Sequence, residues 1–189
     1  MARPSPLSLK TPRLLLLTGP VGVGKSTSAQ AAARHLRAGG LAVACVDLDQ
    51  LYCMVRQSEG FGDPSTWRLA RQTAALLAES FFNRVADVVI VEGGFLTQAE
   101  LDDLTDALRS RPKLKFVSLH GSYETVHARV MADTDPGRVA SKVPAILRGL
   151  YAEYQQALPF LLKATTCVQL DHLDPTRVGW ELAALMTTD

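Results

Sequence analysis

The hydrophobic pattern of this chain switches repeatedly between short apolar runs and longer segments with helical spacing. Five runs have the length of a β-strand, at residues 14–17, 41–46, 88–91, 114–119 and 166–170. Runs that do not alternate with polar residues are typical of strands buried on both faces. Burial on both faces requires helices above and below a mostly parallel sheet, so the pattern predicts an α/β fold.

The segments between the runs repeat apolar residues in steps of three and four, as amphipathic helices do. One series is Ala70, Ala74, Leu77, Phe81 and Val85, and another is Val143, Leu147, Leu150, Tyr154, Leu158 and Leu161. Helix boundaries are predicted at Gly39–Gly40, Asp63–Pro64–Ser65 and Asp174–Pro175–Thr176. With 189 residues, the chain is expected to form a single domain over 1–189, with a proline-containing tail at 1–12.

The composition is that of a globular protein, with 47% hydrophobic and 21% charged residues. The formal net charge of +1 gives no overall attraction to nucleic acid or to an anionic membrane, so neither is expected as a partner. The apolar run at 14–17 is far too short for a signal peptide or a membrane span. The three cysteines lack metal-ligand spacing, and a cytoplasmic monomer or homodimer is expected.

Ligands of parallel sheets bind at the carboxyl ends of the strands, so the residues after each run are the candidates for chemistry. The first run is followed by the pattern G-x-x-x-x-G-K-[ST], between a predicted strand and a predicted helix. Glycines let the backbone N–H groups point inward, Lys25 adds a full charge, and Ser26 offers an oxygen to magnesium. Against the alternative of a plain glycine turn, we predict a triphosphate site formed by Gly19, Pro20, Val21, Gly22, Val23, Gly24, Lys25, Ser26 and Thr27.

Carboxylates follow the second and third runs. Asp47 and Asp49 project to the same side if the backbone is still extended there, and each can orient magnesium through water or accept a proton from a hydroxyl. The alternative is that Asp49 caps the next helix and Asp47 only ends a strand. Glu92 ends the third run and is a second candidate for magnesium, and Gly93 and Gly94 permit close approach of a substrate. A plain turn into a helix near Thr97 is the alternative there.

Arginines flank a polar, turn-rich segment after the fourth run. Arg129 and Arg138 can neutralise charge on a transferring phosphoryl group, and a lid at about 133–141 can exclude water. The alternative is a solvated loop whose arginines pair with Asp133 and Asp135. After the fifth run, the turn at Asp174–Pro175 can lie against an adenine ring or simply start a helix. No histidine has a partner at catalytic spacing.

Together these residues resemble the small P-loop kinases that phosphorylate metabolite or drug hydroxyls, such as shikimate kinase, gluconate kinase and chloramphenicol phosphotransferase. The likeness spans residues 13–186. It implies a three-layer sandwich with a five-stranded parallel sheet in the order 2-3-1-4-5, and ATP and Mg²⁺ as cofactors. It further implies that Lys25 contacts the β and γ phosphates, Ser26 the magnesium, and that Asp47 orients magnesium-bound water.

The same resemblance implies that Asp49 is the base for the substrate hydroxyl, that Arg129 packs on adenine and that Arg138 closes on the phosphates. In this architecture the segment after the second strand forms the acceptor pocket, so Arg56 and Trp67 are candidate substrate residues. Packing of Trp67 on the sheet is the alternative. Shikimate kinases carry a glycine-rich end of the third strand and a particular substrate arginine, whereas here only two glycines follow Glu92 and Arg148 is a candidate counterpart of that arginine but not a clear match.

The expected function is an ATP- and magnesium-dependent phosphotransferase that moves the γ-phosphoryl group to the hydroxyl of a small molecule. A nucleoside or nucleotide kinase remains open, because it would share the same loop and lid. A nucleotide-hydrolysing switch without an acceptor remains open as well, although the N-K-x-D motif of GTPase switches is absent from the sequence.

Overall fold

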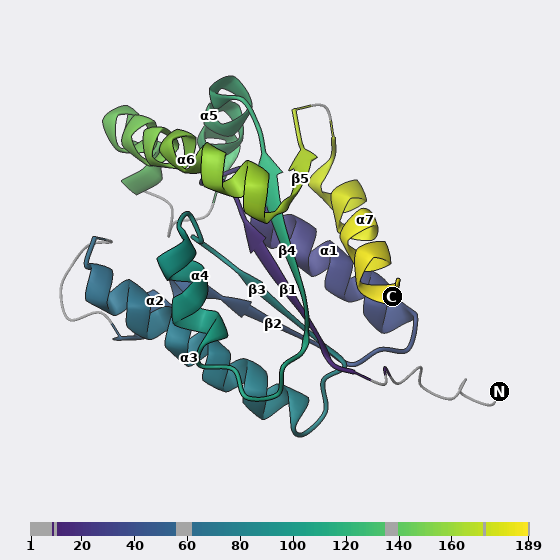
Figure 1. The fold of residues 1–189 in the computed structure, drawn as a ribbon. Helices are drawn as coiled ribbons and strands as arrows, with labels where there is room; N and C mark the ends of the chain where they lie inside the picture. Colours follow the sequence, from purple (N-terminus) through teal and green to yellow (C-terminus); the bar gives the residue numbers. More distant parts are fainter. Residues whose placement is uncertain (1–8, 10, 56–61, 135–139, 172, 189) are drawn as a thin grey trace.

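The computed structural model describes residues 9, 11–55, 62–134, 140–171 and 173–188 (Figure 1). Helices and strands alternate along the chain in the following order: β1 (Arg13–Thr18), α1 (Lys25–Ala38), β2 (Val43–Asp47), α2 (Leu48–Val55), α3 (Pro64–Phe82), β3 (Val88–Glu92), α4 (Gln98–Thr105), β4 (Lys113–His120), α5 (Tyr123–Ala132), the 3₁₀ helix η2 (Ala140–Lys142), α6 (Pro144–Ala164), β5 (Thr166–Gln169) and α7 (Pro175–Thr187).

The five strands form one parallel sheet in the order β2-β3-β1-β4-β5. Central β1 pairs with β3 on one side and β4 on the other, so that Leu17 lies between Glu92 and Val117. The predicted α/β class and the strand order are therefore confirmed. All five carboxyl ends share one edge of the sheet, where the loop that begins at Gly19, Asp47 and Glu92 lie.

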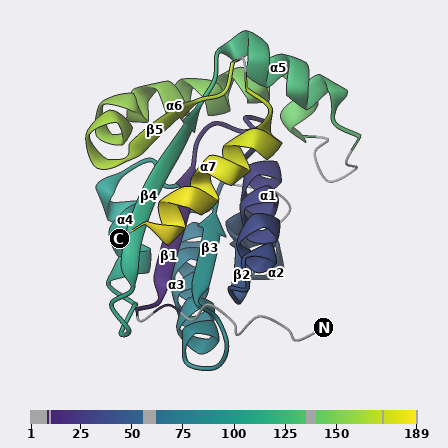
Figure 2. The same ribbon diagram turned by 90° about the vertical axis from the view of Figure 1, so that its right-hand side faces the viewer.

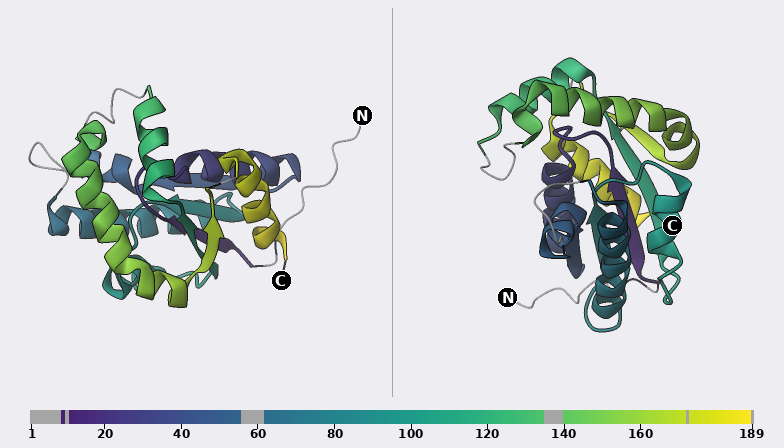
Figure 3. Two further views of the ribbon diagram at one scale, coloured as in Figure 1. Left: turned by 90° about the horizontal axis from the view of Figure 1, so that it is seen from above. Right: turned by 90° about the vertical axis from the view of Figure 1, so that its left-hand side faces the viewer.

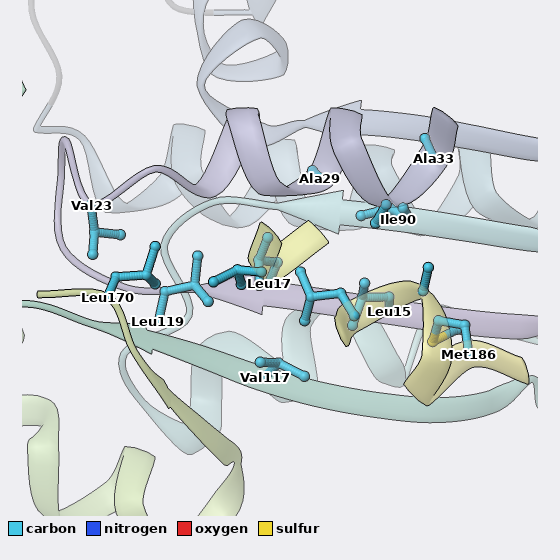
Figure 4. Packing of buried hydrophobic residues seen from close by; sticks show 14 of the residues in the cluster. Leu15, Leu17, Val23, Ala29, Ala33, Ile90, Val117, Leu119, Leu170 and Met186 are labelled. Atoms are coloured by element: carbon cyan, nitrogen blue, oxygen red, sulfur yellow. The ribbon is translucent and has the colours of Figure 1, made fainter. Parts of the chain in front are cut away.

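Both faces of the sheet are buried under helices. Successive side chains of β1 point to opposite faces, so they pack into two separate clusters. Leu15 and Leu17 pack into a cluster with α1 and α7, which Figure 4 shows at close range. Leu14 and Leu16 pack into a second cluster with α2, α3, α4 and α6. Figure 2 and Figure 3 show the resulting layers from three further sides.

The predicted helix starts coincide with side-chain caps. Asp63 accepts the backbone N–H groups of Ser65 and Thr66 at the start of α3, and Asp174 accepts that of Thr176 at the start of α7. Helix α4 begins after a capping box between Thr97 and Glu100. Each cap satisfies donors that the first helical turn leaves open, which fixes where the chain turns from the strand edge into a helix.

Two parts of the sequence prediction differ from the structure. Val85 lies beyond the end of α3 and Val143 before the start of α6, and both side chains are exposed, so the buried faces are shorter than predicted. A helix directly follows β2, where extended backbone through Asp49 was assumed. Of the predicted lid at 133–141, residues 135–139 lie outside the described residues, and so does nearly all of the tail at 1–12. No helix of the described chain is long and apolar enough to cross a membrane.

Candidate active site

The loop between β1 and α1 has the backbone shape that its glycines predict. Gly19 and Gly24 have φ angles of 144° and 111°. A Cβ on Gly19 would lie 2.4 Å from the Leu119 carbonyl oxygen, and one on Gly24 would lie 2.8 Å from Pro175 Cγ. Gly24 is also the N-cap residue of α1 and offers no side chain to its first turn. The N–H groups of that turn are therefore directed at the space in front of the loop.

Lys25 and Ser26 form the first turn of α1 and point to different partners. The Lys25 ammonium donates hydrogen bonds to the carbonyl oxygens of Gly19 and Pro20, each at 3.1 Å, and so lies over the loop. The Ser26 hydroxyl donates to Glu92 Oε2 at 3.0 Å. This bond joins the start of α1 to the carboxyl end of β3. Of the other predicted loop residues, Pro20 and Val23 are buried, Val21 and Gly22 are partly buried, and Thr27 is exposed.

Asp47 and Asp49 are placed by the start of α2 rather than by an extended strand. Asp47 lies beside Glu92 in the sheet register. Its Oδ1 accepts the backbone N–H of Asp49 at 2.8 Å and that of Gln50 at 3.4 Å. The condition that the backbone is still extended at Asp49 is therefore not met, because the helix begins at Leu48. Asp47 ends β2, as the alternative expected, but Asp47 rather than Asp49 accepts the N–H groups at the helix start, and Asp49 is an exposed residue of the first turn.

Electrostatics show that these groups face one another. Burial raises the pKa of Glu92 to about 7; the Lys25 charge and the Ser26 hydrogen bond oppose the rise, and the charges of Asp47 and Asp49 add to it. Burial, followed by the Asp49 charge, also raises the pKa of Asp47, against its two backbone N–H partners and Lys25. The structure therefore brings together one lysine, one serine hydroxyl and three carboxylates from β2, α2 and β3.

The oxygen atoms of this group fit a magnesium ion. Ser26 Oγ and Glu92 Oε2 are already 3.0 Å apart, and Asp47 lies beside Glu92 in the sheet. In the described part of the chain, no group of three or more His, Cys, Asp or Glu residues is arranged to hold a metal. Mg²⁺ typically binds one or two protein oxygens and takes its remaining ligands from water and nucleotide phosphates. The donors present match that mode.

Arg129 joins the phosphate loop to the turn between β5 and α7. Its guanidinium donates to the Val23 carbonyl at 2.5 Å and to the carbonyls of Leu170 and Leu173, each at 3.1 Å. Ser28 of α1 donates to the carbonyl of Pro175 at 3.0 Å, so the turn is held from a second side. Asp174 caps α7. The predicted packing of Arg129 on adenine stays a prediction, and the observed bonds direct its donors to the backbone.

The region predicted to hold the acceptor comprises α2, the start of α3 and the loop after β3. Trp67 is partly buried and packs against the hydrophobic cluster on this face of the sheet, as its alternative expected, with its ring 4.3 Å from that of Tyr52. Gly93 has a φ of 153°, and a Cβ there would lie 2.6 Å from Leu48 Cβ; Gly94 has open space around it. Arg56 and Arg138 lie outside the described residues. Lys142 donates to the Asp133 carbonyl, which brings the two ends of the predicted lid together.

Several residues that shape this site were missed in the sequence. Thr18 exchanges hydrogen bonds with the backbone of Phe95, at 3.3 and 3.1 Å, and so ties the loop after β3 to the residue before Gly19. Glu100 accepts the N–H groups of Leu96 at 2.6 Å and Thr97 at 3.0 Å. The spacing Thr-x-x-Glu before a helix is a readable capping signal. The hydrogen bonds of Thr18 and Arg129 join segments that are distant in the sequence, so no local sequence pattern indicates them.

No protein-family model and no curated protein sequence matches the chain. Solved structures do match. A gluconokinase from Sinorhizobium meliloti is 19% identical with a TM-score of 0.66, over 94% of this chain and 93% of that one. A shikimate kinase from Bacteroides thetaiotaomicron is 18% identical with a TM-score of 0.64, over 93% and 98%. A tunicamycin resistance protein from Deinococcus radiodurans is 20% identical with a TM-score of 0.58, over 95% and 98%. The resemblance to the small P-loop kinases is thus confirmed at the level of the fold.

Proposed function

We propose that the protein is an ATP- and magnesium-dependent phosphotransferase that transfers the γ-phosphoryl group to a hydroxyl of a small molecule. The observation that carries this proposal is the 3.0 Å hydrogen bond between Ser26 and Glu92, within a group of charges that includes Lys25, Asp47 and Asp49. A phosphate-binding loop facing carboxylates across a strand edge is the arrangement that phosphoryl transfer requires. The kinase fold supports the same reading.

Catalysis in such a site comes from positioning and charge neutralisation. The N–H groups at the start of α1 and the Lys25 ammonium hold the phosphates. Ser26 and Glu92 would hold Mg²⁺ and Asp47 would orient water bound to it, and the ion would supply charge that offsets the phosphate oxygens. Arg138, in the predicted lid, adds positive charge as the lid closes. Gly93 and Gly94 let the acceptor approach the backbone at the end of β3.

Asp49 is proposed as the group that accepts the proton of the attacking hydroxyl. It is exposed at the carboxyl end of the sheet, and its charge acts on Asp47 and Glu92. Its exposure in the first turn of α2 leaves its carboxylate accessible to an acceptor. A carboxylate in this position binds and deprotonates the hydroxyl without contacting the nucleotide.

The test is acceptor-dependent release of ADP from ATP and Mg²⁺ across a panel of alcohols, sugars and nucleosides. An alcohol outside the nucleosides that raises ADP release, and that carries the phosphate afterwards, supports the proposal. Phosphorylation of nucleosides alone identifies a nucleoside kinase instead. ATP hydrolysis that saturates at a rate no acceptor improves identifies a nucleotide-hydrolysing switch.

Asp49→Asn then tests the assigned base. We expect it to reduce phosphoryl transfer by about two to four orders of magnitude and to leave ATP affinity nearly unchanged, because the carboxylate acts on the acceptor. Asp106→Asn is the matched control, since Asp106 is an exposed carboxylate at the C-terminal end of α4, away from the loop after β3. Equal activity of the two variants would show that Asp49 is not the base.

A further inference from the structure

A chain of hydrogen bonds runs through buried side chains between β4 and α6. Tyr154 Oη lies 2.5 Å from His120 Nδ1, and His120 Nε2 lies 2.6 Å from Ser118 Oγ. Ser118 Oγ lies 2.5 Å from Thr165 Oγ1, and the Thr165 hydroxyl donates to the Leu161 carbonyl at 2.8 Å. Tyr154, His120 and Ser118 are all buried. None of these groups has a part in the function proposed above.

The direction of each bond follows from the last member of the chain. A carbonyl oxygen can only accept, so the single hydrogen of the Thr165 hydroxyl points to Leu161. Thr165 then accepts from Ser118, whose single hydrogen is used in turn. Ser118 therefore accepts from His120, so Nε2 of the imidazole carries a hydrogen. Cys167 Sγ, 3.5 Å from Ser118 Oγ, is a second and weaker acceptor for the Ser118 hydrogen.

The other ring nitrogen of His120 is an acceptor. Burial lowers the pKa of His120 from its usual 6.5, so the imidazole is neutral at pH 7 and carries one hydrogen. Because that hydrogen is on Nε2, Nδ1 accepts the hydroxyl hydrogen of Tyr154. Burial also raises the pKa of Tyr154, so the phenol keeps its hydrogen. All bonds of the chain thus point one way, from the middle of α6 through β4 to the last turn of α6.

The residues on either side of His120 contact the phosphate loop. Leu119 precedes it, and the Leu119 carbonyl oxygen would lie 2.4 Å from a Cβ on Gly19. Gly121 follows it, and a Cβ on Gly121 would lie 3.3 Å from Val23 Cγ2. Leu119 and Val23 also belong to one buried cluster (Figure 4). A shift of His120 would therefore change the support of the loop at two points.

Helix α6 holds this end of β4 from the opposite face of the sheet. Because side chains alternate along a strand, the side chain of His120 faces α6, whereas that of Leu119 faces α1 and α7. Tyr151 precedes Tyr154 by three residues in α6, and its hydroxyl donates to the Gly121 carbonyl at 2.9 Å. Figure 1 shows α6 passing the carboxyl end of β4. Two successive residues, the last of β4 and the next, are thus bonded to α6.

We propose, on the basis of the function proposed above, that His120 is a positioning residue for nucleotide binding. As the Nε2–H tautomer it fixes the end of β4 against α6, and the phosphate loop packs on that end. The effect reaches the phosphates through Gly19, whose carbonyl accepts the Lys25 ammonium at 3.1 Å. Breaking the chain on either side of His120 should therefore weaken binding of the phosphates themselves.

The tautomer is tested on the protein without ligand. Long-range ¹H–¹⁵N correlation NMR at neutral pH shows which ring nitrogen of each histidine carries a hydrogen. His120→Gln identifies the signals of His120 among those of the four histidines. We expect a neutral imidazole with its hydrogen on Nε2. A hydrogen on Nδ1, alone or together with one on Nε2, overturns the proposed chain.

Two substitutions then test the positioning role. Tyr154→Phe removes the donor to Nδ1, and Ser118→Ala removes the acceptor for Nε2–H. Dissociation constants are measured with Mg²⁺ for ATP and for tripolyphosphate. We expect each variant to weaken both ligands to the same extent, by about three- to tenfold. The double variant should lose less than the product of the two single losses, because either break interrupts the same chain.

The controls separate positioning from stability and from the proposed function. Tyr123→Phe is the matched control, because the Tyr123 ring lies 5.4 Å from that of Tyr151 and outside the chain, and it should leave both dissociation constants unchanged. Variants of Tyr154 and Ser118 with a lower Tm but the parent's dissociation constants overturn the inference alone, and so does weakening of ATP without tripolyphosphate. If the parent binds neither ligand, the proposed function fails and the inference fails with it.

Discussion

Glu92 lies buried at the carboxyl end of β3, and this burial raises its pKa to about 7 from 4.5. The folded state therefore binds the proton of Glu92 more tightly than the unfolded state does. The stability that this proton provides is fully present below pH 4.5 and is lost as the pH rises to about 7. The Ser26 hydroxyl and the Lys25 ammonium limit the loss but do not remove it.

Glu92→Gln keeps the neutral form at every pH. We expect the free energy of unfolding of the ligand-free variant to gain about 3 kcal/mol over the parent between pH 4.5 and 8. Urea unfolding of both proteins across this range measures it. The control is Glu181→Gln, an exposed carboxylate on α7. If the free energies of unfolding of the parent and of Glu92→Gln changed in parallel with pH, the account of Glu92 as a buried carboxyl with a raised pKa would be contradicted.

Arg129 donates to three backbone carbonyls, on the phosphate loop and on the turn before α7. If it acts by holding that turn, Arg129→Gln should weaken ATP binding by about tenfold and leave tripolyphosphate binding nearly intact, because tripolyphosphate has no base to contact the turn. Calorimetric titration with both ligands makes the comparison. Arg129→Lys should behave like Arg129→Gln, because a single ammonium cannot reproduce the planar fork.

A different outcome would assign Arg129 to the phosphates. In that case Arg129→Gln would weaken the binding of ATP and of tripolyphosphate equally. Arg129→Lys would retain much of the affinity for both, because it keeps the positive charge. The two roles of Arg129 therefore predict different ratios of the dissociation constant for ATP to that for tripolyphosphate. Loss of overall stability alone would not change this ratio.

At the scale of elements, the crossing of α1 and α7 fixes the start of α1 under the phosphate loop. Gly179 makes this close approach possible, since a Cβ there would lie 2.4 Å from Ala31 Cβ and 2.8 Å from the Ala32 nitrogen. Backbone atoms cannot move aside as the end of a long side chain can. The packing of two helices is thus set by one residue without a side chain.

Gly179→Ala should destabilise the fold by about 2 kcal/mol or more through overpacking at this crossing. Gly149→Ala in α6 is the matched control, because a Cβ there has no atom within 4 Å. It should stabilise by roughly 0.5–1 kcal/mol through helix propensity alone. Chemical denaturation of both variants checks the contrast, and equal stabilities would contradict the close crossing.

Helix α2 shows what the hydrophobic pattern could not resolve. It has only 8 residues and follows β2 without an intervening loop, so no turn residue marks the boundary between the two in the sequence. Its buried residues Leu48, Leu51 and Tyr52 have helical spacing, but a window this short fits a strand nearly as well. The Asp47 side chain settles the local structure by accepting two backbone N–H groups. With this contact, Asp49 lies in the first turn of a helix rather than in extended backbone.

For the whole molecule, the layer architecture was predictable because apolar runs and turn signals are local properties of the sequence. The phosphate loop was predictable for the same reason. The hydrogen-bond chain through His120 was not, because it joins residues such as Ser118 and Tyr154 that are distant in sequence and carry no shared motif.

The central claim is that the turn between β1 and α1 binds a magnesium–nucleotide complex opposite the carboxylates of β2 and β3. Isothermal titration of the protein with ATP, with and without Mg²⁺, tests it most directly when Lys25→Met is measured beside the parent. We expect saturable binding by the parent that Mg²⁺ strengthens, and a loss of at least about tenfold in Lys25→Met. Absence of saturable binding by the parent, or equal affinities of the two proteins, would contradict the account.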